Sequence, residues 1–183
     1  MIEIRAPFKN DDIEKLVCGD IIKLSGVIYT ARDAAHKRMI DAINNNEKLP
    51  FDVDGSGIYY VGPSPNKKNQ VIGSAGPTTS YRMDKYAPVL LDLGLKGMIG
   101  KGARSEEVIE GIKRNKAIYF GAIGGAGALI SKCIISSEIV AYEDLGAEAI
   151  RKIEVKDMPL TVIIDSEGNN LYEIGKAQYL KSI

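Results

Sequence analysis

The order of hydrophobic and polar positions along the chain predicts strands and helices in alternation. Short apolar or alternating runs predict strands at residues 2–6, 19–30, 58–61, 97–99, 117–120, 134–142 and 160–165. Apolar residues at helical spacing predict helices at 31–43 and 77–93, and a third that begins at 105. Because strands and helices alternate in the middle and hairpin-like strands occupy the end, we predict an α/β fold with a mixed sheet.

The C-terminal part of the chain has a weaker pattern. Residues 143–152 are acidic and predict a partly helical segment. Residues 165–169 predict a turn that leads the preceding strand back into a second strand at 171–174. Residues 176–183 predict a small helix or a tail. We therefore expect a hairpin near the C-terminus.

The stretch at residues 71–84, VIGSAGPTTSYRMD, contains the first candidate site. Its first two residues predict the end of a buried strand, and Pro77 suits the first position of a helix. Thr78 and Arg82 are four residues apart and would then share one helix face, beside the free N–H groups of the helix start. This arrangement suits a carboxylate or a phosphate, but a capped turn with a solvated arginine fits the spacing equally well.

The helix predicted at 31–43 carries a second candidate. Thr30 is its expected N-cap. Arg32 and His36 share a stripe with apolar residues farther along, and an arginine that faces a core needs an anion or a polar rim. His36 is the one histidine of the chain, and it is either a site residue or a hydrogen-bonded packing residue.

Two glycine-bearing turns also attract attention. Lys101 stands between two glycines after a predicted strand, which suits a loop that contacts a ligand but also a plain turn with a solvated lysine. The glycines at 121, 124, 125 and 127 follow another strand, but they do not have the spacing G-x-G-x-x-G, and no G-x-x-x-x-G-K-[ST] occurs. We expect the second group to allow close packing or to line the site.

Composition narrows the class of protein. With 183 residues and 24 basic against 24 acidic side chains, we expect one domain at residues 1–183 and no nucleic-acid partner. No apolar run reaches the length of a membrane span, so we expect no membrane partner. Cys18 and Cys133 are far apart and cannot by themselves form a zinc or iron–sulfur site, so we expect no metal ligands in this chain. Two unpaired thiols favour a cytoplasmic location.

Seven blocks of the sequence resemble, in order, the β subunit of class I fumarate hydratase: YTARDAAHKRM, IYYVGPSP, IGSAGPTTSYRMD, GLKGMIGKG, GAIGGAGAL, EDLGAEAI and PLTVIIDSEGN. The same pattern marks the β subunit of L-tartrate dehydratase and the C-terminal half of single-chain class I fumarases. The resemblance covers residues 19–174. It implies a swivelling β/β/α domain three layers thick, which the periodicity by itself does not predict.

The resemblance also implies a site and a partner. In that family the substrate lies between this domain and a larger α subunit, which holds a [4Fe–4S] cluster and the catalytic aspartate. Carried over position by position, Arg32, Arg82 and Lys101 look like substrate-binding residues, and Thr78 looks like the catalytic residue that moves a proton. The resemblance therefore implies one half of a hydro-lyase that interconverts fumarate and (S)-malate and is active only with its iron–sulfur α subunit.

Three alternatives stay open. The chain is equally similar in its carboxylate-binding residues to an L-tartrate dehydratase β subunit. A stand-alone dicarboxylate-binding module is a second alternative, against which the missing base and cluster argue. A phosphate- or nucleotide-binding protein is the third, and the absence of either phosphate-loop spacing argues against it.

Overall fold

The computed structural model describes residues 1–123 and 125–182. Gly124, one of the loop glycines considered above, and Ile183, the end of the predicted tail, lie outside the described residues. In chain order the strands and helices are β1 Ile2–Ala6, α1 Asn10–Ile13, β2 Ile21–Thr30, α2 Asp33–Asn44, β3 Gly57–Tyr59, η1 Ser80–Met83, α3 Ala87–Asp92, β4 Gly97–Gly100, α4 Glu106–Asn115, β5 Ile118–Gly121, α5 Gly127–Ile130, η2 Ser131–Cys133, β6 Ile134–Ala141, η3 Glu143–Glu148, β7 Ile150–Ile164 and α6 Leu171–Ser182. The η segments are 3₁₀ turns.

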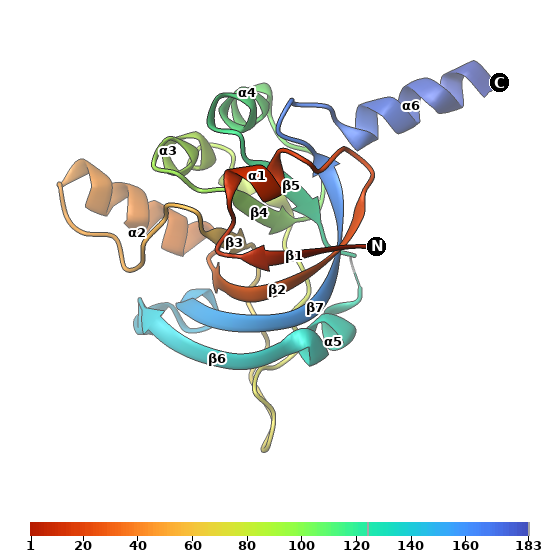
Figure 1. The fold of residues 1–183 in the computed structure, drawn as a ribbon. Helices are drawn as coiled ribbons and strands as arrows, with labels where there is room; N and C mark the ends of the chain where they lie inside the picture. Colours follow the sequence, from red (N-terminus) through yellow and green to blue (C-terminus); the bar gives the residue numbers. More distant parts are fainter. Residues whose placement is uncertain (124, 183) are drawn as a thin grey trace.

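The strands form one mixed sheet with the order β1-β2-β3-β4-β5-β7-β6. Neighbours from β1 to β5 run parallel, whereas β7 runs antiparallel to β5, to β6 and to β2. Because β7 pairs with both β2 and β5, the sheet turns back on itself into two layers of strands (Figure 1). The predicted α/β class with a mixed sheet is therefore confirmed.

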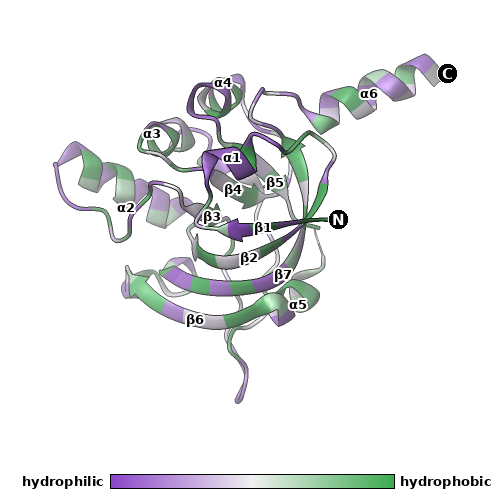
Figure 2. Ribbon diagram, viewed as in Figure 1, coloured by the Kyte–Doolittle hydropathy of each residue, from purple (hydrophilic) through white to green (hydrophobic). Residues whose placement is uncertain are grey.

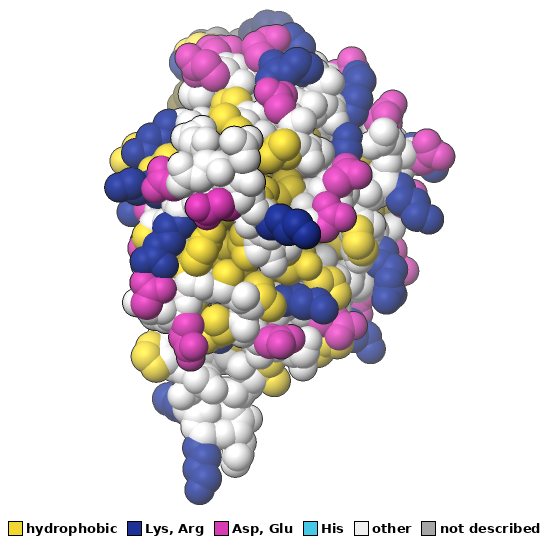
Figure 3. Space-filling model, turned by 90° about the vertical axis from the view of Figure 1, so that its left-hand side faces the viewer, with side chains coloured by type: hydrophobic (Ala, Val, Ile, Leu, Met, Phe, Trp, Pro, Cys, Tyr) yellow, Lys and Arg dark blue, Asp and Glu magenta, His cyan; other side chains and the backbone are white. Residues whose placement is uncertain are grey.

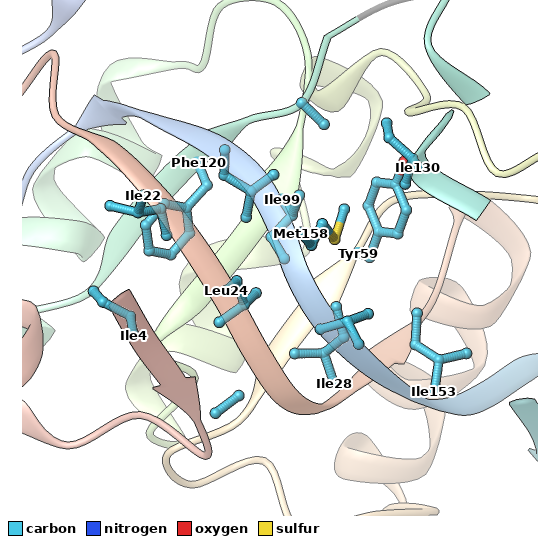
Figure 4. Packing of buried hydrophobic residues seen from close by; sticks show 14 of the residues in the cluster. Ile4, Ile22, Leu24, Ile28, Tyr59, Ile99, Phe120, Ile130, Ile153 and Met158 are labelled. Carbon is cyan, nitrogen blue, oxygen red and sulfur yellow. The ribbon is translucent and has the colours of Figure 1, made fainter. Parts of the chain in front are cut away.

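A first hydrophobic core lies between the two strand layers. Figure 4 shows Leu24 and Ile28 of β2 and Met158 of β7 facing Tyr59, Ile99 and Phe120 across this space. All six side chains are fully buried. Residues adjacent to some of these point the other way, because side chains alternate across a strand. The strands β3, β4 and β5 are thus buried on both faces.

A second hydrophobic core lies between β3–β5 and the helices α2, α3 and α4. It contains Tyr60, Met98 and Tyr119, each next in sequence to a residue of the first core, together with Met39 of α2 and Leu90 of α3. Figure 2 shows that these helices mix hydrophobic and hydrophilic residues, as expected of helices that cover a sheet on one side. Two strand layers and one helix layer make the predicted three-layer β/β/α arrangement.

The predicted C-terminal hairpin is wrong. The strand expected at 160–165 is the last part of β7, which has 15 residues, and the segment after the turn is the helix α6. The side chain of Asp165 accepts hydrogen bonds from the backbone of Glu167 and Asn169, and Asn170 Oδ1 accepts one from Tyr172 N at the helix start. These bonds close the turn and start a helix, so only an isolated bridge between Ile164 and Asn170 remains of the hairpin.

Among the residues that the structure describes, no helix combines the length and the apolar character that crossing a bilayer requires.

Candidate active site

The four predicted site residues lie beyond the ends of three neighbouring parallel strands. Arg32 follows β2, and Lys101 follows β4 directly. Between them, Thr78 N donates to Tyr60 O at 2.7 Å just beyond the end of β3. Parallel strands all end at the same edge of a sheet, which is the usual place for a ligand site in α/β proteins. The structure therefore brings the four residues to one edge.

The segment that contains Thr78 and Arg82 is not the long helix predicted from Pro77. Val71 and Ile72 lie in a bend rather than a buried strand, and Val71 is exposed. Helical structure starts only at Ser80 as a single 3₁₀ turn, and the α-helix α3 begins later, at Ala87. The N–H of Thr78 is hydrogen-bonded to Tyr60 O, just beyond the end of β3. The helix N-terminus predicted at Pro77 is therefore absent. The prediction that Thr78 and Arg82 share one face of a helix is therefore wrong.

Backbone hydrogen bonds hold the neighbourhood of Thr78 against that of Lys101. Thr79 pairs with Lys101 in an isolated parallel bridge. Ser80 N donates to Lys101 O at 2.9 Å, and Lys101 N donates to Ser80 Oγ at 3.1 Å. Gly100 permits this approach, because a Cβ there would lie 2.0 Å from Ser80 Oγ. The position of Lys101 next to Thr78 is therefore fixed by the backbone, while its side chain is exposed.

Asp33 links the two arginines of the site. Its Oδ1 lies 3.3 Å from Arg82 Nε, and its Oδ2 lies 3.7 Å from Arg32 Nε. The exposed fraction of the side chain is 23% for Arg32 and 39% for Arg82, so both side chains are partly exposed, although Arg32 Nε itself is buried. The sequence reasoning missed Asp33. The sequence did contain a signal for it, because Asp33 directly follows the candidate Arg32 at the start of a predicted helix.

Glu148 is the second residue that sequence reasoning missed. Its Oε2 accepts a hydrogen bond from Ala34 N at 2.8 Å, and its Oε1 lies 3.5 Å from Arg32 Nη2. The carboxylate thus caps α2, whose N-cap position is Arg32 and not Thr30 as predicted. Thr30 belongs to β2, and its hydroxyl accepts from Arg151 N. No local pattern could reveal a contact across 114 residues.

His36 is a packing residue beneath the site. It is fully buried, its Nδ1 lies 2.8 Å from Arg32 O, and its ring contacts Tyr60 edge-on at 5.4 Å. Burial lowers the pKa of His36 from 6.5 to about 4, so the ring is neutral at physiological pH. Nδ1 donates to the carbonyl, which leaves Nε2 unprotonated and without a hydrogen-bond partner among the described residues. Of the two interpretations of this histidine, the structure favours packing.

A buried ion pair supports the same edge from the helix side. Arg104 Nε donates to Asp84 Oδ1 at 2.7 Å, and Ser105 N donates to Asp84 Oδ2 at 2.5 Å. The guanidinium also lies 4.9 Å from the ring centre of Tyr119 and 5.4 Å from that of Tyr60. With its side chain fully buried, Arg104 is a structural arginine and not a ligand-binding one.

The described residues do not provide a place for an iron–sulfur cluster. Cys18 N donates to Asp165, and Cys18 Sγ lies 3.4 Å from Ile163 O, whereas Cys133 lies in η2. Burial raises the pKa of each thiol, which disfavours the thiolate that would bind a metal. Within residues 1–123 and 125–182, no three His, Cys, Asp or Glu side chains converge as metal ligands would.

One surface beside the site is partly hydrophobic. α2 projects from the body of the molecule (Figure 1), and the face seen from that side carries a patch of hydrophobic side chains interrupted and bordered by charged ones (Figure 3). Patches of this kind on a protein surface often mark contact with another protein.

The comparisons with known proteins agree on one family. The model of the fumarase C-terminus family matches residues 1–175. A protein of Methanocaldococcus jannaschii named "Putative L(+)-tartrate dehydratase subunit beta" is 40% identical over 177 residues, which are 93% of this chain and 91% of the relative. The aerobic class I fumarate hydratase of Escherichia coli is 39% identical over 154 residues, and fumarate hydratase 2 of Leishmania major is 37% identical over 156. These alignments cover 83% and 84% of this chain but only 28% of either fumarate hydratase.

Proposed function

We infer the function of this chain from the premise that it belongs to the fumarase C-terminus family. We propose that it is the β subunit of a hydro-lyase that interconverts fumarate and (S)-malate. The placement of Arg32, Thr78, Arg82 and Lys101 at one edge of the sheet carries this proposal, because three cationic residues and a hydroxyl residue at one edge suit a dicarboxylate. Its relatives are named for fumarate hydratase or L(+)-tartrate dehydratase, which supports the reaction class.

The cations would bind and orient the two carboxylates. Arg82 uses Nε toward Asp33, which leaves its two outer guanidinium nitrogens to donate as a pair to a carboxylate. Arg32 faces Asp33 with Nε and Glu148 with Nη2, so it would add positive charge and the donor Nη1. Removing a proton from the carbon next to a carboxylate increases the negative charge on that carboxylate. Fixed cations aimed at it lower the barrier because they need no reorganisation as the charge grows. Lys101 would add a third positive charge from the facing loop.

Thr78 would act through its hydroxyl. Its backbone N–H is already committed to Tyr60 O, and the bridge between Thr79 and Lys101 fixes the neighbouring backbone. The hydroxyl would therefore stand at a defined position beside the cations. We propose that it donates or relays a proton to the substrate, or that it positions the substrate for this step.

The other half of the site would come from a second protein chain. We propose an iron–sulfur α subunit that carries the [4Fe–4S] cluster and the catalytic base, because the cysteines of this chain do not fit a cluster and Asp33 is engaged by two arginines. The bound cluster supplies a Lewis acid that helps hydroxide to leave or add. The hydrophobic patch beside α2 supports a partner at this face, and the unpaired cysteines support a cytoplasmic location.

A second candidate substrate is L-tartrate, because the relative that aligns over 91% of its length carries a tartrate dehydratase name. Tartrate differs from malate by one hydroxyl, so the same three cations would bind either. The test is an anaerobic assay of the assembled enzyme with malate and with L-tartrate under identical conditions. We expect a higher kcat/KM with malate. A higher kcat/KM with tartrate would overturn the assignment of fumarate while keeping the hydro-lyase class.

A further inference from the structure

A pocket of about 520 Å³ borders the candidate active site: a Cβ at Gly62 would lie 2.6 Å from Arg32 Nη1 and 3.3 Å from the backbone oxygen of Ala147, which lines the pocket. One wall is the loop at residues 63–73, which hangs below the sheet in Figure 1, and the opposite wall is formed by β6, η3 and the start of β7. Arg151 and Glu143 are the charged side chains of its lining. None of the four candidate site residues lines it.

Both walls of this pocket are held in place by backbone pairing. In the loop, Ser64 N donates to Ser74 O at 3.0 Å, and Ser74 N donates to Ser64 Oγ at 2.9 Å. Gly73 is needed there, because a Cβ would lie 2.0 Å from Ser64 O. On the other side, Ile139 of β6 pairs with Arg151 of β7. The pocket is therefore preformed and does not depend on a ligand to shape it.

Two polar side-chain groups of the pocket lining lack partners. Arg151 Nε and Ser137 Oγ are buried and make no hydrogen bond to any described residue. The guanidinium forms no ion pair within 4.0 Å among those residues either, although the backbone N–H of Arg151 is bonded to Thr30. A partly buried arginine of this kind ordinarily has an anionic or polar partner, so its free state points to a missing one.

We propose that this pocket binds a carboxylate through Arg151. The planar fork of a guanidinium matches a carboxylate with two parallel hydrogen bonds, and the serine and amide groups of the walls can complete its coordination. Glu143 limits the affinity, because its own carboxylate lines the same space. The carboxylate can belong to a free dicarboxylate or to an Asp or Glu side chain of the proposed α subunit.

The first test uses the full chain without any partner. The probe is succinate, a dicarboxylate without a carbon–carbon double bond or hydroxyl group. It is titrated into the ¹⁵N-labelled protein, and the NMR signals of the backbone amides are followed. The protein carries Arg82→Ala, which weakens binding at the candidate active site. We expect shifts at residues around the pocket. Arg151→Gln should weaken this binding at least about tenfold, since it removes a charged hydrogen-bond donor. Glu143→Gln should strengthen it.

The matched control is Lys152→Gln. Lys152 is the next residue of β7, points to the opposite face and lines a different pocket, while the substitution makes the same change in charge. Its succinate binding should stay within about twofold of the parent. If Arg151→Gln proves unstable, Arg151→Lys replaces it. This variant keeps the positive charge but cannot donate two parallel hydrogen bonds, so its affinity for succinate should lie between those of the parent and of Arg151→Gln.

The second test distinguishes the source of the carboxylate. The association of the chain with its iron–sulfur partner is measured for the parent, Arg151→Gln and Lys152→Gln. Succinate binding that only Arg151→Gln abolishes identifies a free dicarboxylate as the ligand. Absence of succinate binding, with assembly weakened at least about tenfold by Arg151→Gln alone, identifies an acidic side chain of the partner. If Arg151→Gln behaves like Lys152→Gln in both measurements, the carboxylate site is disproved. Turnover of malate by the assembled parent enzyme tests the catalytic proposal separately.

Discussion

Asp33 Oδ1 lies 3.3 Å from Arg82 Nε, which joins the first turn of α2 to the 3₁₀ turn that follows Thr78. The same carboxylate reaches Arg32 with its second oxygen. Two cations that would otherwise repel each other are thus held side by side without a substrate. A dicarboxylate that binds there gains two oriented guanidinium groups, but it must approach a carboxylate that already partly neutralises them.

We expect Asp33→Asn to strengthen the binding of a simple dicarboxylate by a factor of a few at low salt, because it removes the competing negative charge. The measurement is calorimetric titration with succinate at low and high ionic strength. The difference between the variant and the parent should shrink as salt rises. Weaker binding by the variant at low salt would show that Asp33 matters mainly for orienting the arginines.

Arg82→Ala and Thr78→Ala are expected to abolish turnover in the assembled enzyme while folding and subunit association remain intact. Both side chains are partly exposed at the sheet edge, and neither belongs to the buried cores, so their removal leaves the packing in place. The measurements are malate turnover, the melting temperature and the association constant with the α subunit. A loss of solubility or of association would assign these residues to structure instead.

Gly100→Ala is expected to lower stability by about 1–3 kcal/mol, because its Cβ would lie 2.0 Å from Ser80 Oγ and 3.0 Å from Tyr60 Cδ2. Ser80 would have to rotate and lose its bond to Lys101 N, so dicarboxylate binding should weaken as well. Chemical denaturation and succinate titration measure both effects.

Gly175→Ala provides the control for that variant. Gly175 lies within α6, and apart from its chain neighbours and the adjacent helix backbone nothing would come within 4 Å of the new Cβ. Its stability should stay the same or rise by up to about 1 kcal/mol, because alanine favours a helix. Equal stability of the two variants would contradict the close contact between Gly100 and Ser80.

Acid is expected to destabilise the fold through His36. The unfolded chain binds a proton on this ring with a pKa of about 6.5, whereas the folded chain does so only near pH 4. The stability contributed by the neutral buried ring is therefore complete above about pH 6.5 and is lost as the pH falls toward 4. One pKa unit corresponds to about 1.4 kcal/mol, so at most about 3.5 kcal/mol is lost.

NMR titration of the ring measures this directly, since the chain has one histidine. The stability of the His36→Gln variant should fall less steeply between pH 6.5 and 5 than that of the parent. A ring that titrates near pH 6.5 in the folded protein would contradict the buried, neutral state.

The strands could be predicted because their signal is local. Continuous apolar runs at residues 97–99 and 117–120 correctly indicated β4 and β5, which are buried on both faces. The helix starting from Ser105 was equally plain, with Glu106 and Glu107 in its first turn. The mixed sheet followed from the order of these elements. The three layers followed from the family resemblance and not from periodicity.

The errors had two causes: long-range contacts that outweigh local propensity near Pro77, and local side-chain hydrogen bonds after β7. The backbone of Thr78 is bonded to Tyr60, and that of Thr79, which is extended, pairs with Lys101. Neither contact is visible in the sequence around Pro77. The hairpin after β7 failed because Asp165 closes the turn with its own side chain. For the candidate site, the sequence and the resemblance named Arg32, Thr78, Arg82 and Lys101, which stay predictions, but not the carboxylates of Asp33 and Glu148 that contact the two arginines.

The measurement that tests the central claim most directly is an anaerobic assay of fumarate absorbance with malate as substrate. It compares this chain alone, the candidate iron–sulfur α subunit alone and the mixture of the two. A site shared between the chains predicts turnover only in the mixture, and its loss when the chain carries Arg82→Ala. Full activity of the α subunit alone, or undiminished activity with Arg82→Ala, would contradict a site completed by this sheet edge.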